Sequence, residues 1–215
     1  MARVILYILL MPQTDRVTDT NISWLKPDQV EAMRDAAYEG RHGDRDDAVV
    51  TMLYDTGLRR GELAQLDVNM LDLDEHELRI PPRIQKDYPN DNSPDPVTFG
   101  LDRGGDLRTA RTLRRYLDGR DDASPALFPS QKSDRLTGKA INDIVKRLAR
   151  RADVEPYGYA GRGDPDDVTA HTLRHSVAWR MLRAEDGNTL YDVRNRLRHA
   201  TIVTTERKYD HFEKV

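Results

Sequence analysis

The spacing of apolar residues constrains the fold of this 215-residue chain more than any other feature. Apolar side chains recur three and four positions apart over most of its length, and this spacing gives a helix one buried face. Residues 67–101 break the pattern with short alternating runs, which are typical of strands. The sequence therefore predicts an α+β fold that is mainly helical, with a small antiparallel sheet of two to three strands.

The ends of the predicted helices coincide with residues that favour such positions. Pro27 suits a first helical turn, and Val30, Met33 and Ala37 follow at helical spacing before Gly40. Further helices are predicted over residues 46–55, 58–66, 106–117, 137–152 and 190–198, and along the stripe Leu173, Val177 and Met181.

Three short runs predict the strands, over residues 70–73, 77–80 and 96–99. A Pro- and Asp-rich loop separates the second strand from the third. Residues 153–168 are rich in Gly, Pro and Asp, and they predict a second loop.

The start of the chain predicts a linker ahead of one domain. Residues 1–23 are interpreted as an N-terminal segment or linker, and residues 24–215 as the domain. The apolar run over residues 4–11 is too short to cross a bilayer, and no small-residue cleavage site follows it. The absence of cysteine excludes disulfides and thiolate chemistry. We therefore expect a cytoplasmic protein.

Domains that bind nucleic acid usually carry an excess of positive charge. The net charge of −3 therefore argues against nucleic-acid binding, if net charge alone is considered. Beneath that balance lie 28 Asp against 9 Glu, and 27 Arg against 7 Lys. This bias favours a halophilic origin in a high-salt cytoplasm, although GC-rich coding would produce the same bias. Local basic clusters are more informative than net charge. The outward face of the helix predicted over residues 137–152 is one such cluster, and it would suit a DNA backbone.

Chemically versatile side chains are densest between His171 and Tyr209. On a helix, His171, Arg174 and His175 would project from one side and could bind an anion. Two histidines four apart could also share a zinc ion, but Thr172 stands where a metalloprotease helix carries its Glu. Each of these side chains alone is more ordinarily a surface or core residue, so the cluster needs support from elsewhere in the chain.

Two upstream residues provide that support. Arg59 follows a glycine break close to the start of a helix, and Lys86 is the single Lys between Lys26 and Lys132. Paired arginines can grip phosphate oxygens, and tyrosine can act as a nucleophile with help from a base or nearby cations. Lysine or histidine can protonate a leaving oxygen. The set suits a phosphodiester held without a metal ion.

These residues lie in segments that resemble the tyrosine recombinases, also called phage integrases. Residues 56–63 (TGLRRGEL) resemble the family's first box, residues 84–86 (IQK) its lysine-bearing hairpin, and residues 171–175 (HTLRH) its His-x-x-Arg box. Residues 197–199 (LRH) resemble the Leu-Gly-His segment, and residues 204–211 (TTERKYDH) the segment that carries the tyrosine. The likeness extends from Trp24 to Phe212, and it implies the family's catalytic-domain fold.

The resemblance implies a site-specific recombinase or integrase of mobile elements, which cleaves and rejoins DNA. Tyr209 would attack the scissile phosphate, giving a 3′-phosphotyrosine link and a free 5′ hydroxyl. Arg59 and Arg174 would hold the non-bridging oxygens, and His199 would assist them. Because the bond energy stays in the phosphotyrosine, rejoining would need no cofactor, neither ATP nor metal.

The resemblance also assigns the proton transfers and the partners. Lys86 would protonate the leaving oxygen, and His171 would accept the proton of the tyrosine. Glu62 would support Arg59, and His175 would support the cluster. The implied partners are double-stranded DNA and further copies of the chain at a synapse, with no membrane.

The sequence departs from the family pattern in three places. Arg198 replaces the usual glycine, where it could add a phosphate contact or follow a different turn. The interval from His199 to Tyr209 is one residue longer than usual, but the nearest other tyrosine, Tyr191, precedes His199. The family's N-terminal DNA-clamping domain is expected to be absent, since about 23 residues precede Trp24. We therefore expect either a catalytic fragment, or a short protein that clamps DNA poorly or needs a partner. A non-catalytic DNA-binding protein of the same fold is the alternative.

Overall fold

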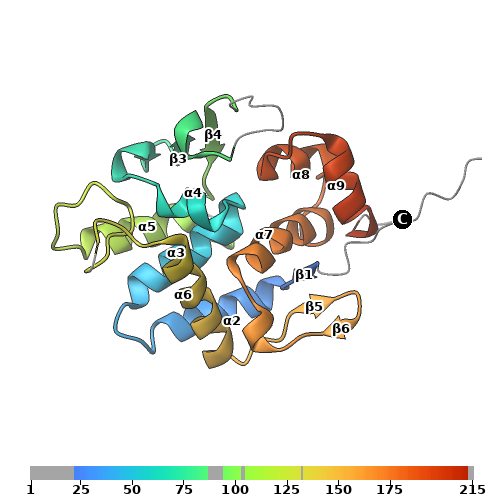
Figure 1. The fold of residues 1–215 in the computed structure, drawn as a ribbon, viewed down its shortest axis with the longest axis horizontal. Coiled ribbons are helices and arrows are strands. Elements are labelled where there is room, and N and C mark those ends of the chain that lie inside the picture. The colour runs from blue at the N-terminus through green and yellow to red at the C-terminus, as the bar shows by residue number, and fades with distance from the viewer. Residues whose placement is uncertain (1–21, 87–93, 103–104, 132, 213–215) are drawn as a thin grey trace, which may run out of the picture.

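Helix α3 (Gly43–Thr56) lies at the centre of the fold, because its residues from Asp46 to Thr56 are buried on every side. Helices α2 (Pro27–Ala37), α5 (Thr109–Asp118) and α7 (Ala170–Trp179) pack against it (Figure 1). The computed structural model describes residues 22–86, 94–102, 105–131 and 133–212. The apolar run predicted over residues 4–11 lies outside this range.

The predicted stripe Val30, Met33 and Ala37 lies on α2, and the stripe Leu173, Val177 and Met181 lies on α7 and the turn after it. Other helices surround α3. They are α4 (Arg60–Ala64), α6 (Gly138–Arg151), α8 (Leu190–Leu197) and α9 (Ile202–Tyr209), with short 3₁₀ turns at Val68–Met70, Pro82–Ile84, Pro165–Asp167 and Asp210–Phe212 and a π-helical turn at Arg180–Ala184. Helix α6 begins where the sequence predicts, since the Thr137 hydroxyl accepts a hydrogen bond from the Ala140 amide at its N-terminus. Helix α9 was not predicted.

The three predicted strands form one antiparallel sheet in the order β2-β3-β4. These strands are β2 (Leu71–Asp72), β3 (Glu77–Ile80) and β4 (Val97–Gly100), and Leu78 pairs with Phe99 in the β3–β4 register. Leu78 and Phe99 are both buried, so this face of the sheet packs on the core. The prediction of a mainly helical fold with a small antiparallel sheet is confirmed.

A second three-stranded sheet was not predicted, and it corrects the loop prediction for residues 153–168. It has the order β1-β5-β6, formed by β1 (Ser23–Trp24), β5 (Tyr157–Gly158) and β6 (Gly161–Arg162). Strands β1 and β5 pair with each other although they lie more than a hundred residues apart in sequence. Both strands are too short to show an alternating pattern. Ser23, expected in the linker, is therefore part of the folded domain.

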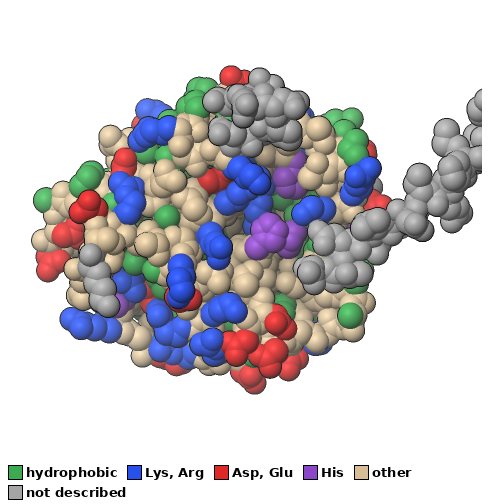
Figure 2. Space-filling view, viewed as in Figure 1, with side chains coloured by type: hydrophobic (Ala, Val, Ile, Leu, Met, Phe, Trp, Pro, Cys, Tyr) green, Lys and Arg blue, Asp and Glu red, His purple; other side chains and the backbone are tan. Residues whose placement is uncertain are grey.

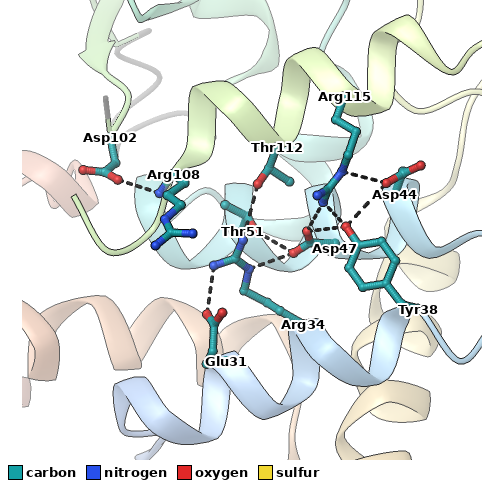
Figure 3. A network of polar contacts seen from close by, with 10 residues as sticks. All are labelled: Glu31, Arg34, Tyr38, Asp44, Asp47, Thr51, Asp102, Arg108, Thr112 and Arg115. Atoms are coloured by element: carbon teal, nitrogen blue, oxygen red, sulfur yellow. Dashed lines mark hydrogen bonds and ion pairs between the residues drawn. The ribbon is translucent and has the colours of Figure 1, made fainter. Parts of the chain in front are cut away.

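A buried polar network joins α2, α3 and α5 (Figure 3). At its centre, the Asp47 carboxylate accepts hydrogen bonds from Arg34 on α2, Arg115 on α5, and the Tyr38 and Thr51 hydroxyls. Because a buried charge is tolerated only when it is paired and hydrogen-bonded, the network fixes how these helices pack.

The C-terminal helices α8 and α9 pack on each other beside α7 (Figure 1). Phe212, in the turn after α9, packs edge-on against Trp24 of β1, with ring centroids 4.9 Å apart. The second sheet thereby holds the end of α9 against the domain. Within the described residues, no helix is long and apolar enough to span a membrane.

Candidate active site

Arg59 is positioned by the break between α3 and α4. Gly57 ends α3 in the left-handed region, with φ of 65°, and the chain turns there into α4. The Glu62 carboxylate then accepts hydrogen bonds from the Arg59 backbone amide at 2.7 Å and from its Nη1 at 3.0 Å. The Arg59 side chain keeps 34% of its surface exposed, so it is partly accessible to solvent.

Arg174 projects from α7 into the interior, where it is 2% exposed. Its two terminal nitrogens donate to the backbone oxygens of Gly57 and Leu197, which lie on either side of it. Burial, followed by the charge of Arg59, lowers the pKa of Arg174 to about 9. The guanidinium therefore remains charged at neutral pH, and it is fixed between the α3–α4 break and the end of α8.

Tyr209, at the end of α9, is 1% exposed and is in contact with α7. Its hydroxyl shares a hydrogen bond with His175 Nδ1 at 2.6 Å. Burial, followed by the charges of His171, Lys208 and Arg174, lowers the pKa of His175 to about 2. A neutral imidazole therefore holds the phenol. Sequence spacing could place His175 on α7 but could not reveal this contact, which spans 34 residues.

His199 covers another side of the same phenol. Its ring stacks on that of Tyr209, with centroids 6.1 Å apart and planes inclined by 13°. The buried Thr205 hydroxyl lies 2.9 Å from His199 Nδ1 and orients the imidazole. Burial, followed by the charges of Arg174 and Arg59, lowers the pKa of His199 to about 3. The role of Thr205 could not have been found before α9 was placed against α8.

His171 and Lys86 lie at the rim of the cluster. His171 is exposed on α7, and its ring centroid is 4.4 Å from that of His175. Lys86 is also exposed, just after the 3₁₀ turn that follows β3. Among the described residues, no hydrogen bond or ion pair joins Lys86 to the other predicted site residues.

Arg198 points inward, an orientation that no sequence pattern indicated. Its Nη2 donates to Glu62 Oε2 at 2.7 Å, so Glu62 is held by two arginines. Burial on its own would raise the pKa of Glu62, but the charges of Arg198 and Arg59 and the hydrogen bonds hold it below its usual value. The residue that replaces a glycine is therefore an internal partner of the cluster.

The surface around the cluster carries positive charge. Histidine side chains emerge near the middle of the face in Figure 2, with Lys and Arg side chains around them and most acidic side chains toward the edges. Arg60 is exposed on α4 and lies against Gly138 at the start of α6, and the neighbouring Lys139 side chain is 85% exposed. Within the described residues, no three His, Asp or Glu side chains are grouped as a metal site would need.

Comparison with known proteins assigns the chain to a family. The model of the phage integrase family matches residues 23–214. The tyrosine recombinase XerC of Herpetosiphon aurantiacus is 33% identical over 201 residues, which cover 91% of this chain and 57% of that protein. This chain thus spans less than two thirds of that relative.

Two solved structures share the fold. The crystal structure of the XerA recombinase has a TM-score of 0.66 and 24% identity, covering 89% of this chain and 60% of that chain. The Tn1549 transposon integrase in complex with transposon right end DNA has a TM-score of 0.67 and 17% identity, covering 89% and 61%. Because the family model matches nearly all the described residues, the predicted resemblance to this family is confirmed, and the chain belongs to the phage integrase family.

Proposed function

We propose that this chain is the catalytic domain of a site-specific recombinase that cleaves and rejoins double-stranded DNA through a 3′-phosphotyrosine intermediate. One observation carries the proposal: the Tyr209 hydroxyl lies 2.6 Å from the neutral imidazole of His175, in a cluster that also holds Arg174 and His199. A phenol held by neutral imidazoles close to the charged Arg174 suits nucleophilic attack on a phosphodiester, because positive charge stabilises both the phenolate and the phosphoryl transition state.

The cleavage step follows from the roles of these groups. The Tyr209 oxygen forms a bond to the scissile phosphorus, and the bond from phosphorus to the 5′ oxygen breaks. Arg59 and Arg174 offset the charge that develops on the non-bridging oxygens, with His199 beside them. Lys86, brought up to the substrate, gives its proton to the leaving 5′ oxygen.

The two histidines of α7 have different roles toward the Tyr209 hydroxyl. His175 has a pKa of about 2, so it cannot retain a proton at neutral pH, and it acts by orienting the hydroxyl. His171 is exposed beside His175, and it is the final acceptor of the proton that leaves the Tyr209 hydroxyl. Since Tyr209 is 1% exposed, α9 must shift to present the hydroxyl to a phosphate.

The basic surface supports duplex DNA as the substrate. Arg60 follows Arg59 in sequence and lies against Gly138 at the start of α6, next to Lys139, and the exposed side chains of Arg60 and Lys139 would contact backbone phosphates. The similar Tn1549 integrase is in complex with transposon end DNA, which supports the same substrate here. We place the chain in the cytoplasm, acting with further copies of itself at a synapse. We assign residues 23–215 to the catalytic domain, one residue more than the predicted 24–215, because Ser23 pairs with Gly158.

The test is a covalent complex. A DNA site is first selected from a random duplex library by the purified chain, and a nicked suicide duplex carrying that site is then incubated with it. The expected result is a protein–DNA band that survives denaturing electrophoresis and disappears in Tyr209→Phe, because the nucleophilic oxygen is gone.

Tyr191→Phe is the matched control, since Tyr191 is 62% exposed on α8 and its loss should leave the band unchanged. A band that persists in Tyr209→Phe would assign the nucleophile to another residue. Binding to the selected site with no covalent band in the wild type would instead favour the non-catalytic DNA-binding protein.

A further inference from the structure

Arg198 occupies a backbone position that normally suits glycine. It ends α8 with φ of 53° and ψ of 51°, in the left-handed region that L-residues with a Cβ adopt at a cost. Such strain persists when surrounding interactions hold the residue there, and it often marks a functional position. The side chain should therefore make a contact that glycine could not.

That contact is directed into the protein. The Arg198 side chain is 5% exposed, and its Nη2 donates to Glu62 Oε2 at 2.7 Å. Its guanidinium carbon lies 5.3 Å from the centre of the Phe99 ring of β4, which covers it on the apolar side. A guanidinium enclosed in this way is directed toward a carboxylate inside the protein.

Glu62 is shared between Arg198 and Arg59. One carboxylate oxygen accepts from Arg59 Nη1, and the other accepts from the Arg59 amide and from Arg198 Nη2. Glu62 is 3% exposed, so water contributes little to stabilising its charge. With Arg59 alone, the carboxylate would cancel much of the positive charge that Arg59 presents. With Arg198 added, the three groups carry a net charge of about +1.

We propose that Arg198 is a positioning residue: it anchors the Glu62 carboxylate that orients Arg59 and offsets its charge, so that Arg59 can stabilise the charge that develops on the scissile phosphate during cleavage. The proposal rests on the proposed function for its effect on cleavage. Its effect on Glu62 stands on the geometry alone and can be measured without DNA.

The first measurement follows the Glu62 carboxyl by carbon NMR as pH is varied. In Arg198→Gly, Glu62 should protonate at a higher pH than in the wild type, because one of its two positive partners is gone. Arg198→Lys should restore the wild-type titration, since a single hydrogen bond is at stake and an ammonium can supply it. An unchanged titration in Arg198→Gly would overturn the proposal.

Asp153→Gly is the matched control. Asp153 is an exposed non-glycine residue with φ of 49°, and replacing it relieves the same backbone strain without touching Glu62. Its Glu62 titration should equal that of the wild type. If Arg198→Gly does not fold, Arg198→Asn provides the same test, because asparagine also tolerates the left-handed region.

The second measurement separates positioning from direct DNA contact. On the nicked suicide duplex, single-turnover formation of the covalent complex should slow about tenfold or more in Arg198→Gly, with unchanged affinity for the duplex. Arg198→Lys should recover most of the rate. In a Glu62→Gln background, removal of Arg198 should cause little further loss, because both act through Arg59.

Affinity that falls in parallel with the rate would overturn the proposal by showing that Arg198 contacts DNA itself. Equal losses of rate in the wild-type and Glu62→Gln backgrounds would overturn it as well. If the wild type forms no covalent complex, the proposed function fails, and the Glu62 titration still decides the role of Arg198.

Discussion

At His175, burial and neighbouring positive charge act in the same direction, and both disfavour the imidazolium form. The ring is 4% exposed and lies close to His171, Lys208 and Arg174. Its pKa falls from its usual 6.5 to about 2, so the folded protein keeps it neutral while the unfolded chain protonates it near pH 6.5.

This difference predicts a dependence of stability on pH. Between pH 6.5 and pH 5 the unfolded chain binds the additional proton, so the free energy of unfolding should fall as pH falls, by up to about 1.4 kcal/mol per pH unit for His175. Urea denaturation at several pH values measures the slope. The slope should be shallower in His175→Gln, and equal slopes in the two proteins would contradict the assigned pKa.

The residue types of the site could be predicted from the sequence, but their orientations could not. Spacing places Arg174 and His175 on one helix, and the resemblance adds Arg59 and Tyr209 to the set. Whether Arg174 points inward depends on the carbonyls of Gly57 and Leu197, far away along the chain. Such contacts are set by tertiary packing, which local patterns do not encode.

At the scale of elements, the break between α3 and α4 links the fold to the site. Gly57 has φ of 65°, and a Cβ there would lie 2.5 Å from Leu197 Cδ2, a fully buried side chain of α8. The same residue provides a carbonyl to Arg174. A side chain at this position would therefore strain the backbone, push α8 away and disturb the arginine.

Gly57→Ala should lower the free energy of unfolding by about 1–3 kcal/mol, from the left-handed backbone and the overpacking. Gly61→Ala is the matched control: Gly61 lies in α4, and a Cβ there meets no atom within 4 Å. This control should keep or raise the stability, because alanine favours a helix. Equal effects of the two substitutions in urea denaturation would show that the α3–α4 break is not strained in this way.

Elements with an internal pattern could be predicted, and elements defined by distant partners could not. Helix α6 has both a Thr137 cap and an apolar stripe, so its bounds follow from the sequence. Helix α9 has a stretch of β-branched residues and few buried positions, so its periodicity is weak. The strands β1 and β5 are two residues long, and they exist because they pair with each other.

At the scale of the whole molecule, some of the abundant Asp and Arg residues form ion pairs with each other within the fold. Pairs such as Asp55 with Arg196 and Asp67 with Arg135 join segments far apart in sequence. A net charge of −3 therefore conceals many opposite charges that neutralise one another. The high-salt origin stays a prediction, because the same composition also provides these internal pairs.

The Asp47 network in Figure 3 shows how such pairs hold the molecule together. The Asp47 side chain is 2% exposed and pairs with Arg34 on α2 and Arg115 on α5. Asp47→Asn should lower the free energy of unfolding by about 3–5 kcal/mol, because it leaves the Arg34 guanidinium buried without its main counter-charge. Thermal and urea denaturation would measure the loss.

Asp44→Asn provides the comparison within the same network. Asp44 pairs with the same Arg115, with 2.8 Å between Oδ1 and Nε, but its side chain is 45% exposed, so its removal should cost about 0–1 kcal/mol. Both substitutions remove a carboxylate from Arg115, but Asp47→Asn also removes the carboxylate that pairs with the buried Arg34, so the contrast measures the contribution of the buried pair. If the two variants unfolded at the same urea concentration, the packing of α2 and α5 on α3 would not depend on the buried charge of Asp47.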